Sequence, residues 1–201
     1  KISININKKK IYFFSNSLFE NDLKNLLATI TIISIYKDIH KLDKNIFYDN
    51  KVINGRGDIV KVKLFNKSFY LVDESYNSNP LSLKSALKNF DIIKVDNSKK
   101  HLVLGDMLEL GKYSKKLHKE VGNYINKTSL KNVNVIGKHV KLAFNNLNKS
   151  KRGNILKRKS QIIDLIKNNL NNNDYLMIKG SYSTGLNSLT NQIKMGKINA
   201  L

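Results

Sequence analysis

The chain of 201 residues contains no cysteine, only one proline and only three arginines. Without cysteine it can form neither a disulfide nor a thiolate metal site, and it has no thiol nucleophile. Its longest apolar stretch, residues 26–36, is far shorter than the roughly 20 residues that cross a bilayer. The first ten residues carry no signal-peptide pattern. We therefore expect a cytoplasmic protein that does not insert into a membrane.

Basic residues outnumber acidic ones by 36 to 15, which gives a formal net charge of +21. Such a charge suits a nucleic-acid-binding module, and this is the first alternative function. Phosphate and base recognition, however, favours the planar donors of arginine, whereas nearly all the positive charge here is lysine. The lysines are scattered along the chain, together with many Asn and Ile residues, as AT-rich codons produce. We therefore expect a solvated basic surface and no nucleic-acid partner.

The beginning of the chain differs from the rest in its pattern of apolar residues. Residues 1–14 alternate like a two-stranded ribbon, and the apolar residues of 22–36 predict a helix buried on most sides. A shorter charged helix is expected at 38–47. The glycine-containing loop that follows marks a domain boundary, which predicts domains 1–54 and 55–201.

The second domain is expected to open with a hairpin of strands 58–64 and 69–72, turning at Asn66-Lys67. Pro80 suits the first turn of a helix, with Asn79 as its N-cap. Helices then alternate with strands expected at 101–105, 133–136, 155–156 and 175–178. This alternation is typical of an α/β fold with a Rossmann-like, mostly parallel sheet and flanking helices.

Polar loops follow four of these strands, and in a parallel sheet the carboxyl ends of the strands share one edge, where ligands bind. The loops are DESYNSN at 73–79, GDMLELG at 105–111, GKH at 137–139 and KGSYSTG at 179–185. We therefore expect a binding site at this edge. Either Asp73 or Glu74 could accept hydrogen bonds from ribose hydroxyls there.

No catalytic residue and no metal site can be assigned from spacing. Residues 105–112 resemble a phosphate-binding P-loop, but five residues instead of four separate the glycines, and Tyr113 stands where a magnesium-binding hydroxyl is required. The four histidines show no metal-ligand spacing. His118 is expected to be a structural, hydrogen-bonded residue, and Asp106 with Glu109 to cap the next helix.

Three of the polar clusters, in this order, resemble the C-terminal domain of the Mur ligases. They are LVDESYNSNPLSLKSAL at 71–87, HLVLGDMLELG at 101–111 and MIKGSYSTGLN at 177–187. ENDLKNLLA at 20–28 and GRG at 55–57 resemble the end of the central, ATP-binding domain of that family. The resemblance covers nearly the whole chain and is strongest to the members that add D-alanyl-D-alanine to UDP-N-acetylmuramoyl-tripeptide.

The resemblance implies part of an ATP-dependent amide ligase of peptidoglycan synthesis. In that reaction the tripeptide carboxylate becomes an acyl phosphate, and the amine of D-alanyl-D-alanine attacks it. ATP and Mg²⁺ are the implied cofactors, with the P-loop and the metal ligands upstream of this segment. UDP-N-acetylmuramoyl-tripeptide and D-alanyl-D-alanine are the implied partners of a monomeric enzyme, and the segment alone is expected to be inactive.

The resemblance also implies which residues bind the nucleotide. Asn25 matches an asparagine that faces the adenine, and Arg56 an arginine that contacts the phosphates or the ribose. One of Asp73 and Glu74 matches the ribose-binding acid, and the alignment favours Glu74 without excluding Asp73. Asn77 falls near the phosphates in this pattern.

The last polar loop contains the implied substrate-binding residues. Lys179 and Ser181 lie on the side where related ligases hold the incoming amino acid. A second alternative is a Rossmann-like binding domain that uses the same polar edge without catalysis. A P-loop upstream in the reading frame would favour the ligase.

Overall fold

The computed structural model describes residues 1–6, 8–16, 20–49 and 53–197 of the chain. The chain divides into two compact units, Lys1–Val52 and Ile53–Leu201. Within the described ranges, no helix has the length and apolar character needed to cross a membrane.

The first unit contains the predicted ribbon and the apolar helix. Strands β1 (Ile2–Ile6) and β2 (Lys9–Phe13) pair antiparallel, and α1 (Glu20–Tyr36) follows them. One side of α1 packs against the ribbon, but Leu27 is 48% exposed and Ile35 71% exposed. The expectation of a helix buried on most sides is wrong within this unit, because a two-stranded ribbon covers only one side of a helix.

The helix expected at 38–47 is also wrong. Only a single 3₁₀ turn forms, at Ile39–Lys41. The Asp38 carboxylate accepts the N–H of His40 at 3.0 Å, and the Asp43 carboxylate accepts the N–H of Asn45 at 2.9 Å. These short-range bonds from aspartate side chains compete with the helical pattern and favour turns.

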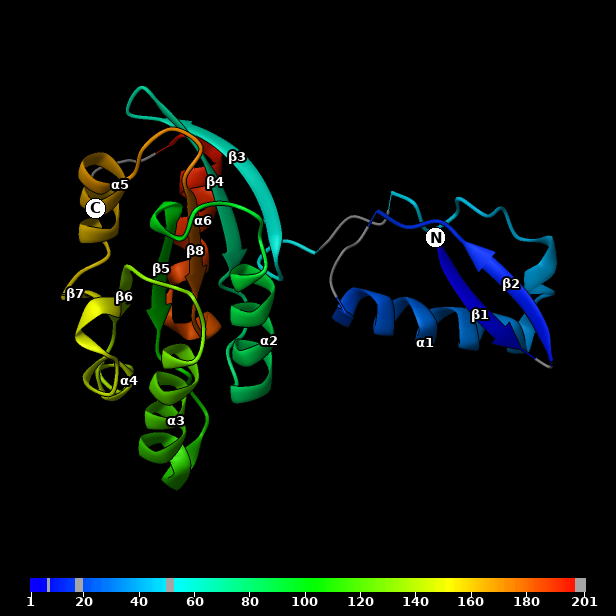
Figure 1. Cartoon of the computed structure of the whole chain (residues 1–201), viewed down its shortest axis with the longest axis horizontal. Coiled ribbons are helices and arrows are strands. Elements are labelled where there is room, and N and C mark those ends of the chain that lie inside the picture. The colour runs from blue at the N-terminus through cyan, green and yellow to red at the C-terminus, as the bar shows by residue number, and fades with distance from the viewer. Residues whose placement is uncertain (7, 17–19, 50–52, 198–201) are drawn as a thin grey trace. The chain divides into compact units, whose positions relative to one another are not determined.

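The second unit is built on a six-stranded sheet with the strand order β3-β4-β8-β5-β6-β7. Only the β3–β4 pair is antiparallel, so the predicted α/β fold with a mostly parallel sheet is confirmed. Figure 1 shows β8 between β4 and β5, in the middle of the sheet. The strands are β3 (Asp58–Leu64), β4 (Lys67–Glu74), β5 (Lys100–Gly105), β6 (Val133–Ile136), β7 (Arg152–Leu156) and β8 (Tyr175–Lys179).

The hairpin between β3 and β4 turns one residue earlier than predicted. Leu64 pairs with Lys67, so the two turn residues are Phe65 and Asn66. Both have positive φ, 51° and 58°, as a two-residue turn of the type that matches strand twist requires.

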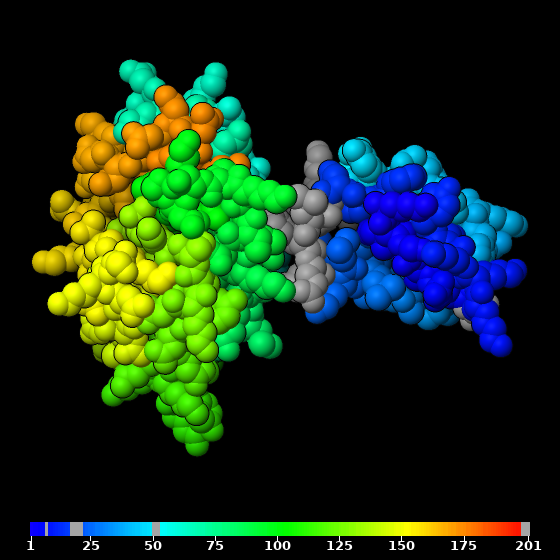
Figure 2. All heavy atoms as spheres, in the orientation of Figure 1, coloured from blue at the N-terminus to red at the C-terminus, as the bar shows by residue number. Residues whose placement is uncertain are grey.

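Helices cover both faces of this sheet (Figure 1). On β5, Leu102 and Leu104 belong to the core beneath one set of helices, and Val103 belongs to the core beneath the other. In the space-filling view, the part of the chain that runs from α2 through α4, coloured green to yellow, forms most of the surface that this unit shows (Figure 2). The first face carries α2 (Pro80–Asp91), α3 (Ser114–Asn126) and α4 (Lys141–Asn145), and the second carries α5 (Ser160–Asn169) and α6 (Leu186–Met195).

Helix α2 begins as predicted, and its start fixes the loop after β4. The Asn79 side chain accepts the N–H of Ser82 at 2.9 Å, and the Ser82 hydroxyl accepts the N–H of Asn79 at 3.0 Å. This reciprocal capping box and Pro80 in the first turn hold the end of the polar loop in place.

Candidate functional site

The loops that follow β4, β5 and β8 are joined through Ser181. Its hydroxyl donates to the carbonyl oxygen of Ser78 at 3.2 Å and accepts the N–H of Leu108 at 2.9 Å. Its own N–H donates to the carbonyl oxygen of Asp106 at 3.1 Å. Three of the predicted polar clusters therefore form one site, and the Ser181 side chain holds it together from within, only 8% exposed.

A buried lysine lies beneath this edge of the sheet. The Lys179 ammonium donates to the Glu74 carboxylate at 3.2 Å and to the carbonyl oxygen of Asn77 at 2.8 Å. Burial lowers the pKa of Lys179, and the Glu74 charge opposes this shift. Burial likewise raises the pKa of Glu74, opposed by Lys179. The bonds of Lys179 fix the loop after β4 in position, while Glu74 stays partly open to solvent.

Arg56 lies on the same edge, in the glycine loop that precedes β3. Its guanidinium lies 4.7 Å from the centre of the Tyr76 ring, and its charge further lowers the pKa of Lys179. Gly55 allows this approach: its φ is +78°, and a Cβ there would lie 2.9 Å from the Tyr76 Cβ. The exposed guanidinium of Arg56 thus lies near Lys179, the buried partner of Glu74.

Asp73, the other candidate acid, is in a different environment from Glu74. Its carboxylate accepts the N–H of Ser75 at 3.0 Å and pairs with the Lys194 ammonium of α6 at 2.5 Å. It is 1% exposed. The structure therefore buries Asp73 among protein partners and leaves Glu74, of the two, nearer to solvent.

Asn77 and Asn25 complete the predicted nucleotide-binding residues. The Asn77 side chain is exposed beside this edge, in the loop between β4 and α2. Asn25 lies on α1 in the first unit, on an exposed side of that helix. The structure thus places all the predicted residues except Asn25 at this edge of the second unit, although the Asp73 side chain faces Lys194 of α6. The role of Asn25 stays a prediction.

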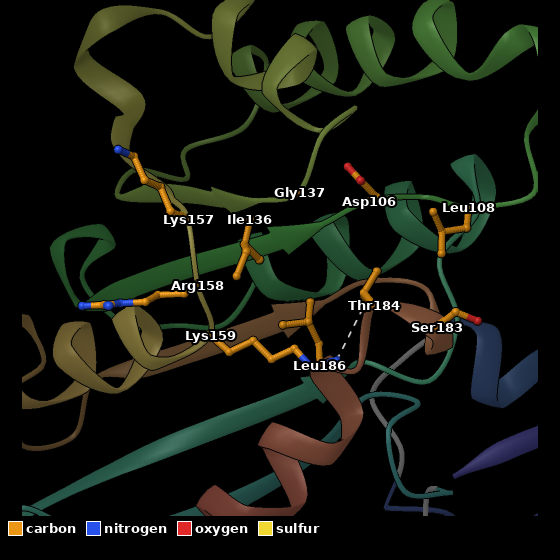
Figure 3. Close-up of a pocket in the computed structure, with 10 residues that line it drawn as sticks. All are labelled: Asp106, Leu108, Ile136, Gly137, Lys157, Arg158, Lys159, Ser183, Thr184 and Leu186. Carbon is orange, nitrogen blue, oxygen red and sulfur yellow. Dashed lines mark hydrogen bonds between the residues drawn. The ribbon is translucent and has the colours of Figure 1, made fainter. Parts of the chain in front are cut away.

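Two adjacent cavities lie along the edge and share Leu108 and Ser183 in their walls. The smaller, about 260 Å³, lies between the loops after β4, β5 and β8. The Ser78 hydroxyl, in a residue 2% exposed that lines this cavity, has no hydrogen-bond partner among the described residues. The larger, about 460 Å³, is shown in Figure 3. Together they provide room for a small substrate at this edge. Asn77, whose carbonyl oxygen accepts from Lys179, lines the smaller one.

Comparison with known protein families shows to which family this domain belongs. A family model described as "Mur ligase, glutamate ligase domain" matches residues 55–182. The chain belongs to the Mur ligase family. The resemblance seen in the sequence motifs is therefore confirmed.

Curated relatives point to one branch of the Mur ligases. A protein of Rickettsia prowazekii (strain Madrid E), named UDP-N-acetylmuramoyl-tripeptide–D-alanyl-D-alanine ligase, is 28% identical over 171 residues, covering 85% of this chain and 36% of that protein. A protein of the same name from Buchnera aphidicola subsp. Baizongia pistaciae is 29% identical over 201 residues, covering 96% of this chain and 40% of that protein. The chain thus spans well under half the length of these relatives.

Solved Mur ligase structures share the fold. The MurF ligase of Thermotoga maritima, crystallised with ADP, has a TM-score of 0.74 at 18% identity, covering 97% of this chain and 43% of that one. A MurF structure from Acinetobacter baumannii has a TM-score of 0.77 at 18% identity, covering 96% and 42% of the respective chains.

The Mur ligase domain uses Asp106 differently from the sequence prediction. Its carboxylate accepts the backbone N–H groups of Lys138, His139 and Val140 at 2.9, 2.9 and 2.7 Å. The expectation that Asp106 caps the next helix is wrong, because Tyr113 occupies the N-cap of α3 and makes no side-chain bond there. Asp106 instead fastens the loop after β6 to the end of β5.

His118 is the structural residue that the sequence predicted. Its Nε2 accepts the N–H of Met107 at 3.1 Å, and its Nδ1 donates to the carbonyl oxygen of Ser114 at 2.8 Å. Burial lowers the pKa of His118, in accord with the neutral ring that this pair of bonds requires.

Among residues 1–6, 8–16, 20–49 and 53–197, no group of three or more His, Asp or Glu side chains could hold a metal ion. The described residues therefore offer no complete set of protein ligands for the implied magnesium ion.

Sequence reasoning missed two lysines that shape the site. Lys194 of α6 pairs with Asp73, 121 residues away in the sequence. Lys159, between β7 and α5, lines the larger cavity. Both belong to unremarkable basic stretches, so only the folded sheet distinguishes them from the other lysines.

Proposed function

We propose that the chain is part of an ATP-dependent amide ligase of peptidoglycan synthesis, which joins D-alanyl-D-alanine to UDP-N-acetylmuramoyl-tripeptide. The observation that carries this proposal is the polar edge of the sheet, where exposed Arg56 and partly exposed Glu74 lie over buried Lys179. The names of the curated relatives and the fold shared with MurF structures support it.

Bound ATP would supply the phosphoryl group that activates the tripeptide carboxylate. The planar guanidinium of Arg56 suits two oxygens of a phosphate, and stacking on Tyr76 holds it at the surface. The Glu74 carboxylate is placed to accept hydrogen bonds from the ribose hydroxyls. Asn77, exposed beside them, lies on the phosphate side in this proposal.

The incoming dipeptide would lie in the cavities next to the nucleotide residues. The unpaired Ser78 hydroxyl offers a hydrogen bond there, because a buried polar group without a partner costs free energy until a ligand supplies one. Lys179 and Ser181 are buried and hold the surrounding loops, so we assign them to positioning this substrate site. Direct contact of either residue with the dipeptide stays a prediction.

The rest of the ligase lies outside the second unit in this proposal. The P-loop and the magnesium ligands would come from the part of the longer relatives that the chain does not span. Residues 1–54, with Asn25 facing the adenine, would be the end of the ATP-binding domain. We also propose that the ligase is cytoplasmic and monomeric, since its implied substrates are soluble nucleotide derivatives and a dipeptide.

The test is product formation by the natural-length protein that carries residues 1–201. It is incubated with ATP, UDP-N-acetylmuramoyl-tripeptide and D-alanyl-D-alanine, and the products are measured by mass spectrometry. We expect the pentapeptide product, one ADP per amide bond, and no product from residues 1–201 alone. Absence of the pentapeptide from the natural-length protein would overturn the proposed function.

A further inference from the structure

Three consecutive cationic residues, Lys157, Arg158 and Lys159, line the larger of the two cavities. They lie between the end of β7 and the start of α5, and Lys159 is the N-cap residue of α5. Figure 3 shows that only Lys159 extends toward Thr184 and Leu186 across the cavity, while the side chains of Lys157 and Arg158 point away from these residues. The three residues therefore share one cavity wall but differ in what their charges can touch.

The Lys159 ammonium is available for a ligand. It takes part in no hydrogen bond or ion pair found among the described residues, although its side chain is half-buried. It lies against Gly185, where a Cβ would overlap it, so the absence of a side chain at Gly185 makes room for it. The start of α5, whose N-cap residue is Lys159, adds positive potential to the same wall of the cavity. An anion in this cavity would therefore meet a cation with no competing partner in the described structure.

The acidic residue of the same cavity is already neutralised in part. Asp106 lines the wall, but both of its carboxylate oxygens accept backbone N–H groups from the loop after β6. Amide dipoles that point at a carboxylate offset its charge. The cavity thus favours an anion near Lys159, on the wall formed by β7, α5 and the loop after β8.

The position of this cavity along the sheet edge indicates how a ligand with an anionic end would lie. The nucleotide-facing residues Arg56 and Glu74 belong to the β3–β4 end of the edge, and the Lys159 cavity spans the ends of β5, β6 and β7. The small cavity lies between them and shares Leu108 and Ser183 with the larger one. A ligand that lies across both cavities has one end toward the nucleotide and the other at Lys159.

We propose that Lys159 binds the carboxylate of the incoming dipeptide, so that the amine at its other end points toward the activated carboxyl group. This inference rests on the proposed function, because it takes D-alanyl-D-alanine as the ligand. An extended dipeptide spans only about 7 Å, so a charge contact at the carboxylate restricts where the amine can lie. Lys159 is thus a substrate-binding residue that selects a free C-terminal carboxylate.

The test compares D-alanyl-D-alanine with its C-terminal amide in the natural-length protein that carries residues 1–201. We expect the wild type to use the amide with a KM about tenfold higher or more, because the charge-assisted bond is lost. Lys159→Met should raise the KM for the dipeptide by a similar factor, leave the KM for ATP unchanged, and abolish the preference for the free carboxylate. Lys159→Arg should restore most of that preference.

Lys157→Met is the matched control. It removes a charge from the same cavity wall, but the Lys157 side chain points away from Thr184 (Figure 3). It should retain the preference for the carboxylate. The inference is overturned if Lys159→Met still prefers the free carboxylate, or if Lys157→Met loses the preference equally. A wild-type protein that forms no amide product instead contradicts the proposed function itself.

Discussion

Lys194 pairs with Asp73 at 2.5 Å, and this ion pair distinguishes Asp73 from the neighbouring acid Glu74. The same ammonium lies 2.6 Å from Asp58, whose side chain is 17% exposed, against 1% for Asp73. Lys194 thus joins α6 to both β3 and β4, and both oxygens of Asp73 have protein partners. Glu74, one residue further, points to the other face of the strand and meets Lys179 and the solvent. We therefore propose Glu74 as the ribose-binding acid and Asp73 as a structural one.

Asp73→Asn should lower the free energy of unfolding by about 2 to 3 kcal/mol, because it weakens the charge-assisted bonds of a buried carboxylate to Lys194 and Ser75, although Asp58 still pairs with Lys194. Asp58→Asn removes the more exposed partner of the same lysine and should cost less, about 1 kcal/mol. Urea-induced unfolding of both variants measures the difference. Equal losses would mean that the two carboxylates contribute alike, and the distinction drawn from burial would be lost.

Glu74→Gln should raise the KM for ATP by about tenfold, because a charged acceptor to the ribose hydroxyls is lost. The KM for D-alanyl-D-alanine should change much less. Asp164→Asn, a charge removal at an exposed position of α5 outside both cavities, is the control and should leave both constants unchanged. An unchanged ATP dependence in Glu74→Gln would place the ribose contact elsewhere.

Local sequence signals were enough to predict much of the fold. The start of α2 was predictable because Asn79 and Pro80 act on their own neighbours, and both cap bonds span three residues. The parallel sheet followed from alternating apolar strands and helices. The helix expected at 38–47 does not form. There the Asp38 and Asp43 side chains accept backbone N–H groups two residues further on, and these bonds favour turns over a helix.

The candidate site could be located from the sequence, but not its internal bonding. A parallel sheet places the loops after its strands at one edge, so this shared edge was predictable from the alternation of strands and helices. The partner of Asp106, however, is a loop 32 to 34 residues away on the neighbouring strand, and the partner of Asp73 is 121 residues away. Such pairings depend on the packing of α4 and α6, which local patterns do not specify.

Gly137→Ala should destabilise the domain through its contact with Asp106. Gly137 has φ +140°, and a Cβ there would lie 2.6 Å from the Asp106 Oδ1. Backbone strain and disturbed carboxylate hydrogen bonds together should cost about 3 kcal/mol. Gly111→Ala is the matched control: its φ is +50° but nothing lies within 4 Å, so only about 1 kcal/mol is expected. Thermal unfolding distinguishes them, and equal losses would leave strain alone as the cause.

The stability of the domain should fall when the pH drops below about 6.5, the ordinary pKa of histidine. Burial lowers the folded-state pKa of His118, so between the unfolded and folded pKa values the unfolded chain binds more protons than the folded one. Stability therefore rises with pH through this window and is lost on acidification. Burial lowers the pKa of His101 in the same direction, with Asp174 opposing the shift.

His118→Gln should therefore give a shallower decline of unfolding free energy between about pH 7 and pH 5, measured by urea-induced unfolding at each pH. His101 continues to titrate in this variant, so part of the slope should remain. His40→Gln, at an exposed site on the 3₁₀ turn of the first unit, should leave the slope as it is in the wild type. If His118→Gln shows the wild-type slope, the Met107 and Ser114 bonds do not hold the ring neutral, and another group carries the pH dependence.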